Sequence, residues 1–288
     1  MERGQTFNTV AATYDAQRSG YPEALFDDLW EMARLEPGHR VLEIGCGTGQ
    51  ATAGFAARGL RVVAIDPGDR LLDVARRKLI AFPNVQFETA SFEDWPLGER
   101  SFQLVAAAQS WHWVQPEVRF DKAASALSPG GCLAIFGHTR RWSPEIMDAL
   151  QPVYLRFAPE IWGPPGENWY LPEGPISDLV AASGRFEPAA HRNYAWARQY
   201  SSKSFAAYLG TLSDHVRLAK DRREALLAAA ELALPNELSA AWETISTSRP
   251  PGSADAKWGI QRRRKRRRLT PSRTARWSAP RRSRRRPV

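Results

Sequence analysis

The sequence predicts an α/β protein in which a mainly parallel sheet is covered by helices. Strand-like apolar runs alternate with helix-like amphipathic segments, the pattern of parallel strands joined by crossover helices. In addition, the stretch VLEIGCGTGQ (Val41–Gln50) places a buried strand directly before a glycine turn and a helix. The three closely spaced glycines indicate a backbone that makes room for a ligand.

The expected elements follow from apolar spacing and from proline and glycine stops. Strands are expected at 40–44, 61–66, 84–89, 102–108 and 132–138. Helices are expected at 21–35, 49–58, 69–82 and 117–127. Residues 139–175 interrupt the alternation with many prolines and aromatic side chains, so we expect a cap above the strand ends. A helix (176–183), a long strand (186–200) and helices between 203 and 242 complete the body.

Composition limits the cellular setting. With 288 residues and 43% hydrophobic content, the chain can form one large domain with additions. It shows neither a signal-peptide pattern nor the run of about 20 apolar residues that a membrane span needs. Cys46 and Cys132 lack the spacing of metal ligands. We therefore expect a cytoplasmic protein without a metal.

The net charge of +9 is unevenly distributed. Residues 249–288 contain 16 of the 40 Lys and Arg residues and one acid, Asp255, whereas residues 1–248 carry a net charge of −6. We therefore expect a body domain at 1–248 and a disordered Arg-rich tail at 249–288. Nucleic-acid binding is expected only through the tail, and the partner of the body is expected to be a small molecule.

The glycine turn has two candidate ligands. A dinucleotide fingerprint requires a glycine three places after its second glycine, but Gln50 stands there. Glu43 precedes the turn, and a carboxylate disfavours a pyrophosphate but suits a ligand with a sulfonium and an amino group. Asp66, at the end of the second strand, can accept both hydroxyls of a ribose, or it can cap the next helix.

Five segments in order carry a resemblance: VLEIGCGTG, AIDPG, FEDWP, AAQSWHWV and LSPGG. Together they resemble a class I S-adenosylmethionine-dependent methyltransferase and are most similar to the bacterial small-molecule type, such as trans-aconitate methyltransferase-like proteins. The opening FNTVAATYDAQRSGYPEAL (7–25) resembles the segment that folds over the cofactor in that group. The resemblance implies a Rossmann-like sheet of seven strands in the order 3-2-1-4-5-7-6, with the last strand antiparallel.

The resemblance also implies residue roles. Gly45, Gly47 and Gly49 would admit the methionine part of the cofactor, Glu43 would act on its amino end and Asp66 would hold its ribose. The adenine side would be lined by Pro67 and Phe92, since Ser91 stands where the family often has an Asp. Gln109 completes the expected cofactor-binding set: Glu43, Gly45, Gly47, Gly49, Asp66, Pro67, Phe92 and Gln109.

The segment QSWHWV follows the fourth strand, where an acceptor would meet the methyl group. Trp111 and Trp113 offer flat walls for a substrate, and Arg140 could pair with a carboxylate on it. His112 is the titratable group of this segment and is either a general base or a structural histidine; His138 is a further candidate.

The expected function is methyl transfer from S-adenosylmethionine to a small organic acceptor, at a carboxylate or a hydroxyl. The alternatives are a catalytically inactive nucleotide-binding module and a basic-tailed nucleic-acid-binding protein. A dehydrogenase is disfavoured by Gln50.

The end of the chain departs from the family pattern. After ELSAAWETI (237–245), which we interpret as helical, the sequence offers no obvious β-branched strand, so the closing strand is expected to be missing. The tail is then either a genuine basic arm or the product of a shifted reading frame, because the charge change and the missing strand coincide.

Overall fold

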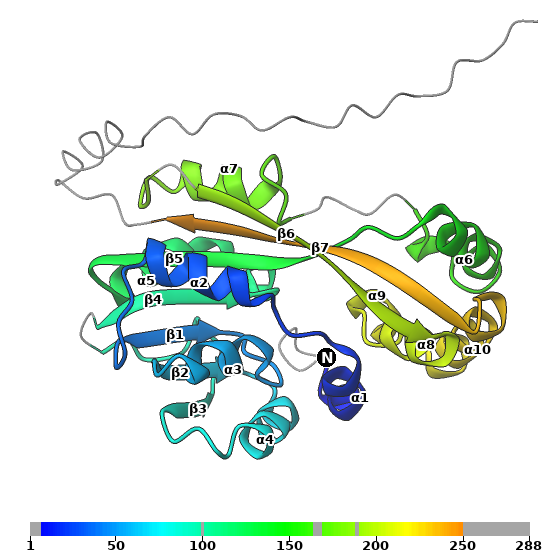
Figure 1. Cartoon of the computed structure of the whole chain (residues 1–288), viewed down its shortest axis with the longest axis horizontal. Coiled ribbons are helices and arrows are strands. Elements are labelled where there is room, and N and C mark those ends of the chain that lie inside the picture. Colours follow the sequence, from blue (N-terminus) through cyan, green and yellow to red (C-terminus); the bar gives the residue numbers. More distant parts are fainter. Residues whose placement is uncertain (1–6, 99–100, 164–168, 188–189, 250–288) are drawn as a thin grey trace, which may run out of the picture. The chain divides into compact units, whose positions relative to one another are not determined.

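The computed structural model describes residues 7–98, 101–163, 169–187 and 190–249. Their centre is one seven-stranded sheet of order β3-β2-β1-β4-β5-β7-β6 (Figure 1). The first five strands are β1 (Arg40–Ile44), β2 (Arg61–Asp66), β3 (Val85–Thr89), β4 (Phe102–Ala108) and β5 (Leu127–Arg140). They pair in parallel, as the alternating pattern predicted.

Two long strands complete the sheet: β6 (Ala190–Ser201) and β7 (Glu237–Arg249). β7 lies between β5 and β6 and is antiparallel to both. The order and the single reversed strand confirm the Rossmann-like arrangement that the resemblance implied.

The closing strand was expected to be missing, and this expectation is wrong. The residues interpreted as a helix form β7, whose side chains from Leu238 to Ser248 are buried apart from Ser239, Ala241 and Glu243. Glu, Leu and Ala favour a helix when read locally, but β5 and β6 both lack a neighbour at this place and pair with the segment along its length. The argument for a shifted reading frame was that the strand is missing where the charge changes; since the strand is present, that argument no longer holds.

Helices cover both faces of the sheet. The helices in chain order are α1 (Ala11–Gln17), α2 (Glu23–Met32), α3 (Gln50–Ala57), α4 (Asp69–Lys78), α5 (Pro116–Ala126), α6 (Pro144–Phe157), α7 (Pro175–Ala182), α8 (Ser202–Leu209), α9 (Ser213–Val216) and α10 (Lys220–Ala233). Short 3₁₀ turns occur at η2 (Asn8–Val10), η3 (Trp111–Trp113) and η4 (Pro159–Ile161). α2, α3 and α4 share one hydrophobic core with the sheet, and α5 and α7 share the other.

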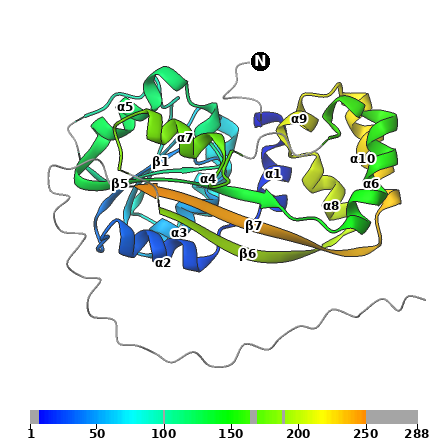
Figure 2. The same cartoon turned by 90° about the horizontal axis from the view of Figure 1, so that it is seen from above.

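A third core lies where β6 and β7 extend beyond the other strands (Figure 2). There α6, α8 and α10 pack on Tyr200, Leu238 and Trp242. The predicted cap therefore contains a well-packed helix, α6, that belongs to a small helical lobe (α6, α8, α9 and α10) built on the two long strands.

The tail at 250–288 lies outside the described residues, so the expectation of disorder is not addressed by the structure. Among the residues that the structure describes, no helix is long and apolar enough to cross a membrane, and no cluster of side chains could hold a metal ion.

Candidate cofactor and acceptor site

The glycine turn begins at the carboxyl end of β1. The N–H groups of Gly45 and Cys46 both donate to the carbonyl oxygen of Ile65 on β2, at 2.8 and 3.1 Å. Gly45 has a φ of 66°, and a Cβ built on it would lie 2.5 Å from the Cβ of Ser110. A side chain at position 45 is therefore excluded, because the loop after β4 approaches the turn closely.

The other two glycines face different surroundings. A Cβ built on Gly47 would lie 3.9 Å from the ring of Tyr14. A Cβ on Gly49 would instead lie 2.9 Å from Leu79, on the side of the turn that packs against α4. Gly49 has a φ of 81° and is needed for the left-handed entry into α3. The structure thus places Gly45 and Gly47 at the cavity described below, and Gly49 outside it.

Asp66 ties the glycine turn to the end of β2. Its Oδ2 accepts a hydrogen bond from the N–H of Gly47 at 2.9 Å, and its Oδ1 accepts one from the N–H of Gly68 at 2.8 Å. Neither bond goes to an N–H group within α4, which begins at Asp69, so these bonds do not make Asp66 an N-cap of that helix. Burial raises its pKa to about 6, against the opposing effect of these two bonds.

Glu43 is fully buried on β1, directly beneath the turn. Its Oε2 accepts a hydrogen bond from the Thr52 hydroxyl of α3 at 2.7 Å, whereas its Oε1 has no partner among the described residues. Burial is the main reason that the pKa of this carboxyl is raised to about 8; the Thr52 hydrogen bond opposes the rise, and the nearby charge of Asp66 adds to it. A buried carboxyl with one unused oxygen can receive a donor from a ligand.

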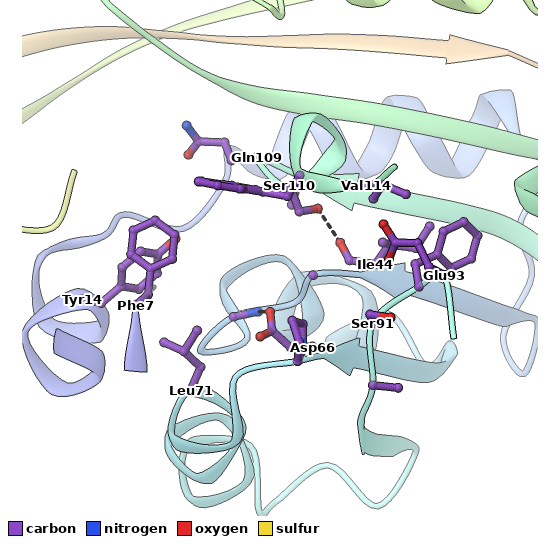
Figure 3. A pocket seen from close by; sticks show the side chains of 17 residues that line it. Phe7, Tyr14, Ile44, Asp66, Leu71, Ser91, Glu93, Gln109, Ser110 and Val114 are labelled. Atoms are coloured by element: carbon purple, nitrogen blue, oxygen red, sulfur yellow. Dashed lines mark hydrogen bonds between the residues drawn. The ribbon is translucent and has the colours of Figure 1, made fainter. Parts of the chain in front are cut away.

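A cavity of about 110 Å³ opens above these groups; we call it the Asp66 cavity (Figure 3). Its walls come from the glycine turn, the end of β2, the loops after β3 and β4, and the N-terminal segment. Six of the predicted cofactor residues line it: Gly45, Gly47, Asp66, Pro67, Phe92 and Gln109. Glu43 faces an adjoining small space that it shares with Tyr14 and Gln109.

The N-terminal segment closes one side of the Asp66 cavity with Phe7 and Tyr14 (Figure 3). Two contacts hold it against α4: Asn8 Nδ2 donates to Asp69 Oδ1 at 2.8 Å, and Lys78 Nζ pairs with an oxygen of Asp15 at 2.6 Å. The segment therefore lies beside the predicted cofactor site. Phe7 and Tyr14 were not predicted individually as site residues.

The loop after β3 supplies the opposite wall. Phe92 is buried and lines the cavity together with Ser91 and Glu93. Ser91 donates its hydroxyl to the carboxylate of Asp94 at 2.7 Å, and Asp94 is exposed. Glu93 was not predicted as a site residue, and its Oε1 accepts a hydrogen bond from the N–H of Gln115 at 2.6 Å.

The loop after β4 begins with an unusual backbone. Gln109 has a φ of 55°, although it is not a glycine, and its N–H donates to the carbonyl of Phe136 at 2.8 Å. Such a conformation costs free energy and is often found at functional positions. Ser110 then donates its hydroxyl to the carbonyl of Ile44, which joins this loop to the glycine turn (Figure 3).

The segment QSWHWV separates its aromatic residues. Trp111 is fully buried and packs against Phe120 in the core, so it lines no described cavity and is not a wall for the acceptor. The 3₁₀ turn η3 directs Trp113 into the site instead. His112 lies beside it with Nδ1 3.2 Å from the hydroxyl of Tyr170, and burial lowers its pKa to about 4.

A second, wider cavity of about 560 Å³ adjoins the first; we call it the Arg140 cavity. Four residues line both cavities: Phe7, Tyr14, Gln109 and Trp113. The Arg140 cavity is further lined by Arg18, by His112 and by residues of α6, of α9 and of the segments 140–142 and 161–163. The Arg140 cavity is thus a second compartment beside the Asp66 cavity, and the four shared residues form the wall between the two cavities.

His138, the further histidine candidate, is packed away from both cavities. Its ring stacks on Tyr21 at 4.5 Å and lies edge-on to Trp196. Its Nδ1 is 2.9 Å from the hydroxyl of Thr244 on β7, and burial lowers its pKa to about 3. These contacts make it a packing residue of the sheet.

Comparisons with known proteins agree with this architecture. Residues 41–131 match the family model described as Methyltransferase domain. Uncharacterized methyltransferases of Mycobacterium bovis and Mycobacterium tuberculosis are 37% identical over 135 residues, which are 47% of this chain and 53% of each relative. The chain thus aligns with about half the length of these curated relatives. A demethylmenaquinone methyltransferase of Tropheryma whipplei is 30% identical over 205 residues, which are 67% of this chain and 84% of the relative.

The chain belongs to the class I S-adenosylmethionine-dependent methyltransferases.

Solved structures extend the likeness to the whole fold. A structure from Anaeromyxobacter dehalogenans, described as a candidate type II methyltransferase, has a TM-score of 0.58 at 26% identity and covers 80% of this chain and 97% of that one. The crystal structure of a [4+2]-cyclase has the same fold, with a TM-score of 0.50 at 17% identity, covering 86% of this chain and 96% of that one. A class I methyltransferase fold therefore does not by itself fix the reaction, which must be argued from the site.

Proposed function

We propose that the chain transfers a methyl group from S-adenosylmethionine to a small organic acceptor. The observation that supports this proposal most directly is the pair of adjoining cavities. One contains the glycine turn and Asp66, the other is wider and aromatic, and four residues line both. A two-substrate transfer needs such a partition, because the donor and the acceptor must meet at a shared wall.

The residues at the turn suit the cofactor. Glu43 has an unused buried oxygen for an amino group, and the carboxylate of Asp66 can receive ribose hydroxyls in addition to its two backbone bonds. Gly47 leaves the space between the turn and Tyr14 open. Phe92 and Pro67 offer apolar surface that would suit an adenine, and the carboxylate of Glu93 in the same cavity could accept a hydrogen bond from the adenine amino group.

The cofactor would supply a methyl group on a sulfonium centre: a nucleophile would attack the methyl carbon in line with the carbon–sulfur bond, and the sulfur would leave as the thioether of S-adenosylhomocysteine. The residues of the chain contribute positioning and exclusion of water. Phe7 and Tyr14 cover the cofactor side, while Gln109 and Trp113 form the shared wall. Since burial keeps His112 neutral at pH 7, its role is that of a hydrogen-bonding partner, or of a proton acceptor when the nucleophile is a hydroxyl.

The acceptor is proposed to carry a carboxylate or a hydroxyl. Trp113 and Arg140 both line the wider cavity, so a flat body with an oxygen substituent fits its chemistry. The domain boundary is proposed at residue 248, with the tail taking no part in the reaction.

The proposal is tested by incubating the full chain with S-adenosylmethionine labelled in its methyl group and with pools of small organic acids and phenols. We expect the label in a small-molecule fraction. The Asp66→Ala variant serves as the matched control. Label transfer that is equal in the variant, or absent from every pool while the cofactor binds, would contradict the proposed function.

A further inference from the structure

A buried histidine–tyrosine pair that the sequence did not predict lies in the wider cavity, which the predicted residue Arg140 also lines. Tyr154 on α6 and His215 on α9 are 3% and 4% exposed, and the Tyr154 hydroxyl lies 2.6 Å from Nε2 of His215. Both line the Arg140 cavity. Nδ1 of His215 has no hydrogen-bond partner among the described residues.

The pair has an unused proton donor in either tautomer. If His215 carries its proton on Nε2, it donates to the oxygen of Tyr154, and the Tyr154 hydroxyl hydrogen is left without an acceptor. If the proton is on Nδ1, Tyr154 donates to Nε2, and the Nδ1–H is left instead. A buried donor without a partner costs free energy, so the pair favours a ligand that brings an acceptor.

The charge around the pair favours an anionic acceptor group. Arg18 and Arg140 line the same cavity, and neither forms an ion pair with a carboxylate in the described part of the chain. Arg18 instead donates to the hydroxyl and the carbonyl of Thr211, at 3.1 and 2.8 Å, and the guanidinium of Arg140 lies over the ring of Trp142. Asp214 is the acidic residue among those lining this cavity, and Arg141 is already paired with Glu243.

We propose that Tyr154 and His215, together with Arg18 and Arg140, bind an anionic group of the methyl acceptor, such as a carboxylate. This inference rests on the proposed function. None of the four residues lines the Asp66 cavity. The anionic group therefore anchors the acceptor in the Arg140 cavity, while the apolar body of the acceptor contacts Trp142 and Trp162 and reaches Trp113.

The test compares two probes of the same shape, indole-3-acetate and indole-3-acetamide, which differ in charge. Their affinities for the full chain are measured by titration calorimetry, with and without saturating S-adenosylhomocysteine. The wild type is expected to prefer the carboxylate by about tenfold or more, since a hydrogen bond to a charged group is worth that factor. Tyr154→Phe and Arg140→Gln are each expected to reduce this preference by about tenfold.

Leu155→Ala is the matched control, because Leu155 is next to Tyr154 on α6 but is 55% exposed. It should keep the preference, and all variants should bind S-adenosylhomocysteine as the wild type does. A wild type without preference for the carboxylate, or a preference that survives both substitutions, would overturn the inference. Failure of the proposed function would look different: S-adenosylhomocysteine would not bind, or no labelled methyl group would reach any acceptor, whatever the probes do.

Discussion

The two carboxylates beside the glycine turn, Asp66 and Glu43, differ in how their oxygens are hydrogen-bonded in the free protein. Asp66 satisfies both oxygens with backbone N–H groups, whereas Glu43 leaves one oxygen unused. Both have raised pKa values because burial disfavours their charge. The hydroxyls of a ligand would stabilise the charged form of Asp66, and an ammonium group would stabilise the charged form of Glu43 and use its free oxygen. These two residues should therefore respond differently to substitution and to pH.

Asp66→Ala is expected to weaken S-adenosylhomocysteine binding by about tenfold or more, because a charge-assisted hydrogen bond is worth about 1.5–3 kcal/mol. Calorimetric titration measures the dissociation constant directly. Asp73→Ala on the exposed face of α4 is the control acid and should leave the constant unchanged. Equal constants for Asp66→Ala and the wild type would show that Asp66 only orders the turn.

Glu43 should make cofactor binding depend on pH. With a pKa of about 8, its carboxyl is mostly protonated at pH 7 in the free protein. An ammonium group beside it favours the charged form, so binding should release about one proton at pH 7, and affinity should rise between about pH 6 and 8. Titrations in buffers of different ionisation enthalpy count the proton. Glu43→Gln should bind without this release; a wild type that releases none would contradict the assignment.

The same carboxyl should affect stability in the absence of ligand. Its folded pKa of about 8 lies above the ordinary value of 4.5, so the folded state holds a proton that the unfolded chain has lost. The free energy of unfolding contributed by this group therefore falls as the pH rises from about 4.5 to about 8. Glu43→Gln should show a flatter stability profile over this range in urea unfolding. An identical slope in both proteins would refute the shift.

At the scale of elements, the strands around the glycine turn could be predicted because each has a strong local signal. β1 and β2 have the predicted bounds, since apolar runs end at Gly45 and Asp66. β7 could not be predicted, because its residues Glu237 to Ala241 have helical preferences and their pairing depends on β5 and β6, which are distant in the sequence.

The site was predictable to the same extent. Residues within motifs, such as Gly47 and Asp66, could be singled out from the sequence, and they line the Asp66 cavity. Tyr154 and His215 carry no motif, and α6 and α9 bring them together from positions 61 residues apart. Trp111 was misjudged because a sequence shows that aromatic residues are adjacent, but not which of them a 3₁₀ turn directs into the core.

Ile245 tests the contribution of the closing strand. It is fully buried on β7 and packs in the core that β7 shares with β4 and β5. Ile245→Ala should lower the free energy of unfolding by about 2–5 kcal/mol, the usual cost of such a cavity. Leu232→Ala on α10, where the side chain is 87% exposed, should change it by less than about 0.5 kcal/mol. A similar small effect at Ile245 would mean that the strand is not part of the folded core.

At the scale of the whole molecule, the body and the basic tail are proposed to be independent. A chain that ends at Arg249 retains every described strand. It should bind S-adenosylhomocysteine with an unchanged dissociation constant, while any salt-dependent binding of duplex DNA by the full chain should disappear. A shortened chain that no longer binds S-adenosylhomocysteine would show that the tail supports the cofactor site.

The cavity above the glycine turn is predicted to bind the nucleoside of a methyl donor. The most direct test of this prediction is calorimetric titration of the full chain with S-adenosylhomocysteine and, separately, with NAD. We predict saturable binding of S-adenosylhomocysteine that weakens in Asp66→Ala, and no comparable binding of NAD. Binding of NAD without binding of S-adenosylhomocysteine would contradict the account.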